Sequence, residues 1–167
     1  MKKIYFTAGI LLFCCCKKNP VQPPVDPVLQ VPYEHGIASG RSMFKTIGPA
    51  GDSLNTLDGK MMLIIPPEVL TEVTFVGIRN ITNMLPGSIG KSYRLYPENI
   101  VFNKPIEILY TYTAAELAAA PKGVLYLAIQ NKAGYWTVLD KTQMDKNKHT
   151  LKVSTACLGD YTTYPGK

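Results

Sequence analysis

The stretch PIEILYTY, residues 105–112, decides the fold class. Large apolar side chains recur at every second position from Ile106 to Tyr112, which is the period of a β-strand with one face in a core. Tyrosines on one face could also form a platform for sugar rings. Because two isoleucines share their face, we expect Tyr110 and Tyr112 to lie in the core.

Short strand patterns continue on both sides of this stretch. Met61 to Ile65 is an unbroken apolar run between a turn at Asp58-Gly59 and the pair Pro66-Pro67, and it predicts a strand buried on both faces. Further strand patterns cover residues 73–81, 125–130, 136–139 and 151–153, with a turn at 131–134.

One segment, residues 113–120, has a helical pattern. Thr113 and Glu116 have the spacing of a capping box, and Pro121 ends the helix. The patterns together predict an all-β protein, a β-sandwich of about seven to nine mostly antiparallel strands with one short helix.

The composition agrees with one globular domain plus appendages. The chain has 167 residues, of which 46% are hydrophobic and 18% charged, with a formal net charge of +6. This apolar content argues against a disordered chain, and the many glycines, prolines and aromatic residues argue against a helical bundle.

Residues 1–16, MKKIYFTAGILLFCCC, have the features of a secretory leader. Lys2 and Lys3 form a basic start, and the apolar stretch that ends at Phe13 is too short for a hydrocarbon layer of about 30 Å. Three cysteines close the segment, which resembles the signal of bacterial lipoproteins. We therefore expect a lipoprotein signal peptide over residues 1–14. Its removal by cleavage is expected to leave a lipidated cysteine at the new N-terminus.

The residue before that cut must be small, so Phe13 disfavours Cys14 as the lipid acceptor. Cys15, with Leu12 three positions upstream, fits best, and Cys16 is the alternative. Only Cys157 lies far from this cluster, so no disulfide framework is expected inside the domain.

Residues 15–35 combine the anchor cysteine with a proline-rich stretch, which contains five prolines. Proline fixes φ and disfavours a helix in the residue before it, so we expect an extended tether with a reach of about 3.1 Å per residue. The folded domain is then expected over residues 36–167.

Five segments follow one another along the chain: DGKMMLIIPPEVL (58–70), YRLYPENIVFNKPIEILYTY (93–112), LYLAIQ (125–130), GYW (134–136) and TACLGDY (155–161). Their order and spacing resemble the ZU-five domain, a family found in bacterial envelope lipoproteins. The resemblance covers roughly residues 47–164 and implies a β-sandwich. Some family members cleave themselves within a His-Phe-Ser motif. Cys157, Leu158 and Gly159 stand at those three positions, so we expect no self-cleavage here.

No pattern predicts catalytic residues, a metal site or a cofactor. GSIGKS (87–92) lacks the spacing of a phosphate loop and precedes a strand rather than a helix. His35 and His149 are far apart in the sequence, and we expect both to be solvent-exposed rather than metal ligands. The lysine-rich segment 139–152 could contact an anionic polymer, but its mixed charges favour a solvated hairpin.

Four tyrosines, Tyr93, Tyr96, Tyr126 and Tyr135, are the candidates for a ligand-binding surface patch. The favoured function is therefore a non-enzymatic interaction or structural module, lipid-anchored to the cell envelope and binding an envelope protein or polysaccharide. The alternatives are a secreted hydrolase, a self-processing enzyme or a carbohydrate-binding accessory module. Lys17 and Lys18 favour the periplasmic side of the outer membrane, and this location disfavours a nucleic-acid partner.

Overall fold

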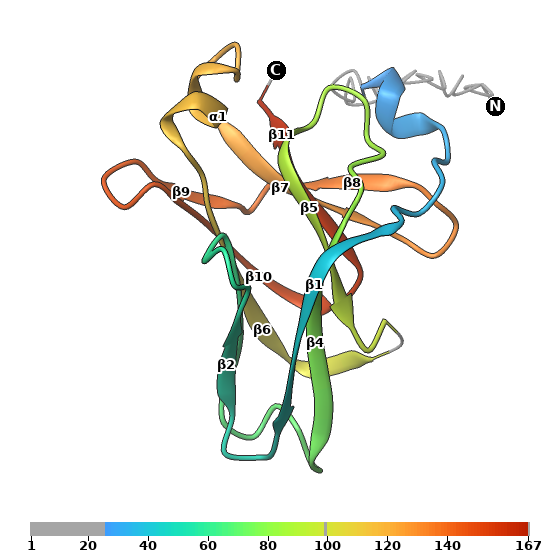
Figure 1. Ribbon diagram of the computed structural model, residues 1–167, viewed down its shortest axis with the longest axis vertical. Coiled ribbons are helices and arrows are strands. Elements are labelled where there is room, and N and C mark those ends of the chain that lie inside the picture. Colours follow the sequence, from blue (N-terminus) through green and yellow to red (C-terminus); the bar gives the residue numbers. More distant parts are fainter. Residues whose placement is uncertain (1–25, 99, 167) are drawn as a thin grey trace, which may run out of the picture.

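The computed structural model describes residues 26–98 and 100–166, so the candidate anchor residues Cys15 and Cys16 lie outside the described residues. Within these ranges eleven strands form two sheets that pack face to face, and every strand pairing is antiparallel (Figure 1). The expected all-β sandwich is confirmed, with more strands than the sequence patterns predict.

The first sheet has the strand order β1-β4-β5-β11-β7-β8. Its members are β1 (Ala38–Ile47), β4 (Thr74–Ile81), β5 (Ile89–Tyr96), β11 (Asp160–Pro165), β7 (Leu125–Gln130) and β8 (Trp136–Leu139). The second sheet has the order β2-β3-β6-β10-β9. Its members are β2 (Asp52–Asn55), β3 (Met61–Ile65), β6 (Val101–Thr111), β10 (Thr150–Cys157) and β9 (Gln143–Asp145).

Strand β6 lies at the centre of the second sheet and turns its alternating side chains toward the first sheet. Ile106, Ile108 and Tyr110 are fully buried, and Tyr112, just after the strand, is almost so. The expected core position of Tyr110 and Tyr112 is confirmed. Full burial of each isoleucine contributes about 1.5–3 kcal/mol to folding.

Strand β3 also alternates, so the expectation that it is buried on both faces is wrong. Met61, Leu63 and Ile65 are in the core, whereas Met62 and Ile64 are half-exposed. The reason is that β3 belongs to an antiparallel sheet, which needs to bury only one face. An apolar run therefore supplies both the core and part of the outer surface.

The single described α-helix, α1 (Ala114–Ala118), begins at the capping box that the sequence predicts. The Glu116 amide donates to Thr113 Oγ1 at 3.1 Å, and the Thr113 amide donates to Glu116 Oε2 at 2.7 Å. The cap fixes the Glu116 carboxylate beside the end of β6, where it takes part in the polar network described below.

Residues 26–35 pack against the outer face of the first sheet instead of forming a free tether. The short 3₁₀ helix η1 (Pro27–Gln30) begins after Asp26, whose Oδ2 accepts from the Tyr164 hydroxyl at 2.5 Å. The Tyr33 amide donates to the Gly134 carbonyl at 2.9 Å. The expected domain boundary at residue 36 is therefore too late. The segment joins the fold because its apolar side chains cover Trp136 and its neighbours on β7, β8 and β11.

The outer face of the first sheet is thus covered only in part. Segment 26–35 lies over β7, β8 and β11, while β1, β4 and β5 form the other half of the sheet. Figure 1 shows η1 near one end of the long axis and the loop between β1 and β2, with the start of β4, at the opposite end.

Candidate functional site

Three aromatic side chains gather on the uncovered part of the first sheet. Phe44 on β1 and Phe75 on β4 stack with ring centres 5.1 Å apart and planes 7° from parallel. The ring centre of Tyr96, at the end of β5, lies 6.0 Å from that of Phe44. Phe75 is 62% exposed and Phe44 is 40% exposed, and Val73, two residues before Phe75, is exposed as well. We call these four residues the aromatic patch.

A glycine in the middle strand brings the rings together. Phe44 and Tyr96 lie directly opposite Gly77, one on each side of β4. Strands two apart in a sheet are separated by roughly 9.5 Å, so ring centres 6.0 Å apart require side chains that lean over the strand between them. A Cβ atom on Gly77 would overlap the Phe44 ring. The missing side chain at residue 77 therefore allows Phe44 to lie across β4.

Polar groups border the aromatic patch. The Arg79 Nε donates to Ser42 Oγ at 2.6 Å, and its guanidinium carbon lies 5.8 Å from the centre of the Tyr96 ring. Such a cation–π contact is worth about 0.5–1 kcal/mol at an exposed site. Within the described part of the chain, neither the two Nη groups of Arg79 nor the Tyr96 hydroxyl has a hydrogen-bond partner. These donors are consequently available beside the rings.

The structure does not bring the four candidate tyrosines together. Tyr93 is 0% exposed and lies in the core, so its place in a surface patch is wrong. Tyr96 belongs to the aromatic patch, whereas Tyr126 is half-buried on β7 and Tyr135 is 41% exposed in the turn before β8. Side chains alternate between the two faces of a strand, so Tyr93 and Tyr96, three positions apart on β5, point to opposite faces of the sheet. Tyr93 therefore faces the core.

Phe44, Phe75 and Gly77 were not predicted from the sequence as site residues. A signal for two of them exists in β4, where Phe75, Gly77 and Arg79 share one face and buried Val76 and Ile78 share the other. Phe75 and Arg79 lie on either side of Gly77 on this face of β4, and such a pattern is compatible with an exposed aromatic surface. The partner Phe44 lies on β1, and only the strand pairing reveals that it meets them.

A charged row crosses the same sheet next to the aromatic patch. Residues directly paired from β1 to β8 are Ser42, Arg79, Arg94, Asp160, Gln130 and Trp136. At its centre, Asp160 is buried and forms two contacts with Arg94, Nε to Oδ1 at 2.6 Å and Nη2 to Oδ2 at 2.7 Å. The aspartate raises the pKa of Arg94 further above its usual value. This pair fixes β5 to β11.

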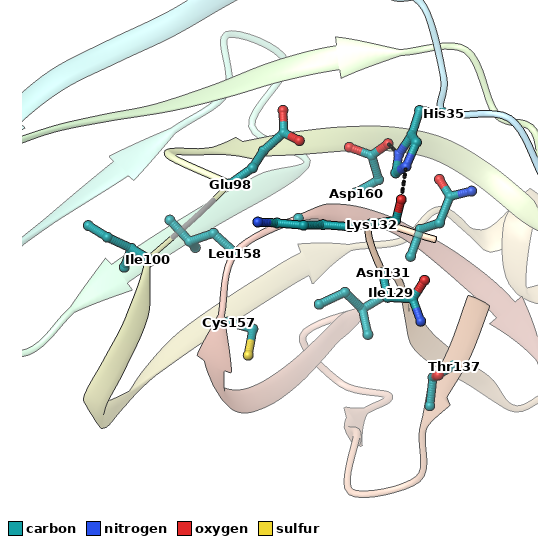
Figure 2. Close-up of a pocket in the computed structure, with 12 residues that line it drawn as sticks. His35, Glu98, Ile100, Ile129, Asn131, Lys132, Thr137, Cys157, Leu158 and Asp160 are labelled. Carbon is teal, nitrogen blue, oxygen red and sulfur yellow. Dashed lines mark hydrogen bonds and ion pairs between the residues drawn. The ribbon is translucent and has the colours of Figure 1, made fainter. Parts of the chain in front are cut away.

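His35 meets this row from the N-terminal segment (Figure 2). Its Nδ1 lies 3.1 Å from Asp160 Oδ2, and its Nε2 lies 3.4 Å from the Lys132 carbonyl oxygen. The expectation of an exposed histidine is confirmed, since the side chain is 38% exposed. The imidazole also holds segment 26–35 to the sheet. His149 is exposed, at the turn before β10.

A pocket of about 370 Å³ opens beside the turn between β10 and β11 (Figure 2). Ile129 and Leu158 contribute to its mostly apolar lining, which Lys132 and Cys157 border. Figure 2 shows the Cys157 thiol pointing away from His35. The contact between His35 and Asp160 resembles the pair of general base and orienting carboxylate in a catalytic triad. Among the described residues, however, no thiol or hydroxyl nucleophile lies against the imidazole.

Two carboxylates form a separate polar network with two buried tyrosines at the edge of the core. Asp58 Oδ2 accepts from Lys91 Nζ at 2.6 Å and from the Tyr93 hydroxyl at 3.0 Å. Glu116 Oε1 accepts from Lys60 Nζ at 2.5 Å and from the Tyr110 hydroxyl at 3.0 Å.

This network holds both carboxylates in the ionised form. Partial burial alone would raise the pKa of Asp58, but hydrogen bonds from Lys91, Thr56 and backbone outweigh burial and lower its pKa well below the usual range. The pKa of Glu116 is also lowered, because the hydrogen bonds from Lys60 and Thr113 outweigh burial. Burial raises the pKa of both tyrosines. A general acid needs a raised carboxyl pKa, so the network suits structural support rather than proton transfer.

Among the described residues, no three His, Cys, Asp or Glu side chains come close enough together to hold a metal ion. None of the helices in residues 26–98 and 100–166 has the length and apolar character needed to cross a bilayer.

Comparison with known proteins adds no relative. No protein-family profile matches the chain, and no curated protein is significantly similar to it. The resemblance to the ZU-five family, the lipid anchor and the absence of self-cleavage therefore stay predictions from the sequence.

Proposed function

We propose that the protein is a lipid-anchored, non-enzymatic binding module of the cell envelope and that the aromatic patch is its binding surface. Cys15, or alternatively Cys16, carries the lipid in this proposal. The sandwich belongs to a ZU-five-like domain, and its partner is an envelope component rather than a nucleic acid.

The exposed stack of Phe44 and Phe75 is the observation that carries the proposal. Exposed apolar surface costs roughly 25 cal/mol per Å² relative to burial, and the main contiguous apolar patch of a soluble domain is often an interaction site. Gly77 permits this arrangement although glycine is unfavourable within a strand by about 0.5–1 kcal/mol relative to alanine. The exposed rings and the glycine within β4 are both unfavourable for stability. Together they form an exposed aromatic surface, which a binding function requires.

The position of the aromatic patch supports the same function. The described chain starts at Asp26, next to η1, near one end of the long axis, and Phe75 lies close to the start of β4 at the other end (Figure 1). A domain tethered through its N-terminus would therefore direct the patch away from the membrane that holds the anchor.

Two observations favour a binding module over a hydrolase or self-processing enzyme. The carboxylates of Asp58 and Glu116 both have lowered pKa values, whereas a carboxylic-acid catalyst needs one carboxyl group with a raised value. The thiol of Cys157 points away from His35, so this pair lacks the contact that activates a cysteine nucleophile (Figure 2).

The test is co-sedimentation of the full chain, carrying Cys15→Ala and Cys16→Ala so that no lipid inserts it into a membrane, with cell envelopes of the organism that encodes it. We expect saturable binding that weakens about tenfold in Phe75→Ser, since loss of one stacked ring removes on the order of 1.4 kcal/mol. Tyr135→Ser is the matched control, because it removes an exposed aromatic ring outside the patch. Binding that is absent, or unchanged in Phe75→Ser, would refute the proposed function.

A further inference from the structure

We infer that the aromatic patch binds pyranose rings of an envelope polysaccharide. This inference rests on the proposed binding function of the patch and names the class of its partner. It is drawn from the shape of the ring surface, the hydrogen-bond donors beside it, the extent of its apolar area and the closed edge of the sheet.

The ring surface offers apolar faces to a sugar. A pyranose ring presents C–H groups on its face, and these pack against the electron-rich face of an aromatic ring. Phe44 and Phe75 stack on one another with ring centres 5.1 Å apart, so the stack is open to a sugar only on its outward side. The Tyr96 ring, with its centre 6.0 Å from that of Phe44 and its plane tilted by 43°, offers a second contact at an angle to the stack.

Polar groups lie next to the rings. A sugar that stacks through its face turns its hydroxyl groups to the sides, where they need hydrogen-bond partners. The guanidinium of Arg79 is held beside Tyr96 by Ser42, and the residues that the structure describes leave its two Nη groups without acceptors. The Tyr96 hydroxyl adds a donor and an acceptor. Apolar faces flanked by such groups match the amphipathic surface of a saccharide.

The apolar area of the patch is small. A stable protein–protein interface buries about 800 Å² on each partner. The aromatic patch consists of three rings and Val73, which together offer only a few hundred Å². It ends at the charged row that contains Arg79 and Arg94. An area of this size suits a few sugar rings better than a folded partner.

The neighbouring sheet edge is protected against the addition of a strand. β1 is the edge strand, and Lys45 points from it toward the second sheet, where its Nζ contacts Asp52 Oδ2 at 2.6 Å. An inward-facing charge on an edge strand opposes pairing with a further strand. A peptide that adds to the sheet at β1 is consequently disfavoured as the occupant.

The experiment compares three probes prepared from the same cell envelopes. The first is untreated envelopes, the second is the polysaccharide fraction left after digestion with proteinase and nuclease, and the third is vesicles of the extracted lipids. Binding is measured for the full chain with Cys15→Ala and Cys16→Ala, which carries no lipid, and in this background for wild-type patch residues, Phe75→Ser, Tyr96→Ser and the control Tyr135→Ser. Near-UV circular dichroism of each variant verifies that the fold is retained.

We expect wild type and Tyr135→Ser to bind the digested polysaccharide as tightly as untreated envelopes. Phe75→Ser and Tyr96→Ser should bind it about tenfold more weakly, and the vesicles should not bind through the patch. Patch-dependent binding to untreated envelopes that disappears after digestion would overturn the saccharide inference and leave the proposed function intact. Patch-dependent binding to vesicles, or a dimer that Phe75→Ser dissociates in sedimentation velocity, would overturn it as well. Absence of binding to untreated envelopes would refute the proposed function itself.

Discussion

Arg94 on β5 and Asp160 on β11 face one another in register and are joined by two contacts of 2.6 Å and 2.7 Å. The aspartate is buried, and the guanidinium is largely so. Loss of one partner from such a pair leaves an uncompensated charge and destabilises a protein by about 3–5 kcal/mol. We predict that Asp160→Ala lowers the free energy of unfolding by about 3 kcal/mol in urea titrations at neutral pH.

The control for this prediction is the exposed pair Lys104–Glu68, whose Nζ and Oε2 atoms are 2.9 Å apart. Solvent screens an exposed ion pair, so Lys104→Gln should leave the urea midpoint unchanged. Equal effects of Asp160→Ala and Lys104→Gln would show that the Arg94–Asp160 pair does not hold the sheet together.

Acid should destabilise the protein through Asp58 and Glu116. Their pKa values are lowered in the folded state, whereas in the unfolded chain Asp and Glu protonate near pH 4. The unfolded state therefore binds more protons than the folded state as the pH falls, and the contribution of these groups, complete above about pH 5, is lost toward pH 2. We predict a lower urea midpoint at pH 3 than at pH 7.

The variant Asp58→Asn tests this assignment. It should be less stable than wild type at pH 7, because its amide cannot pair with Lys91 as the carboxylate does. It should also lose less stability between pH 7 and pH 3, because one of the titrating groups is gone. An equal loss in wild type and variant would mean that other carboxylates cause the acid sensitivity.

Gly90 is a further position where the structure demands glycine. Its φ is +81°, and a Cβ atom would overlap the Tyr110 hydroxyl and the Glu116 carboxylate. Gly123 also has a positive φ, of +60°, but a Cβ atom there meets nothing within 4 Å.

Comparison of the two alanine variants separates backbone strain from crowding. Gly123→Ala should cost about 1–2 kcal/mol for the left-handed conformation alone. Gly90→Ala should cost about 1–3 kcal/mol more, because overpacking of the polar network adds to the strain. Thermal unfolding of both variants measures the difference, and similar melting temperatures would contradict the packing around Gly90.

The proposed anchor predicts a defined mature N-terminus. Mass spectrometry of the N-terminal peptide should find a lipidated cysteine, with Cys15 favoured and Cys16 as the alternative. Cys15→Ala combined with Cys16→Ala should abolish lipidation of this peptide. An unmodified Met1 on the mature chain, or a lipidated N-terminal peptide in the double variant, would contradict the proposed anchor.

The sequence predicts the fold where local pattern and tertiary environment agree. The structure has the predicted alternation in β6 and the predicted capping box of α1. Both depend on neighbouring residues in the sequence, since one face of β6 is buried and the cap joins residues three positions apart. The strands β1 and β9 show no comparable pattern. β1 is an edge strand with mostly exposed residues, and β9 is only three residues long, so burial imposes little on either sequence.

The candidate site was much less predictable, because it is made by strand pairing. Phe44 and Gly77 are 33 positions apart, and only the register of β1 and β4 places one across from the other. Tyr93 illustrates the opposite error, since a tyrosine in a strand gives no local sign of which face is buried. The packing of residues 26–35 was hidden for a similar reason, as a proline-rich composition does not reveal which sheet its apolar side chains cover.

The most direct test of the central claim is the binding of Gly77→Ala to untreated cell envelopes. This substitution, made in the chain with Cys15→Ala and Cys16→Ala, keeps every aromatic residue of the patch. Its Cβ atom would overlap the Phe44 ring and come close to the Met43 carbonyl oxygen, so the Phe44 ring must move. The account predicts that binding weakens at least fivefold while the near-UV circular dichroism spectrum keeps its overall folded form. Binding of Gly77→Ala equal to that of wild type would contradict the claim that the arrangement of Phe44, Phe75 and Tyr96 forms the binding surface.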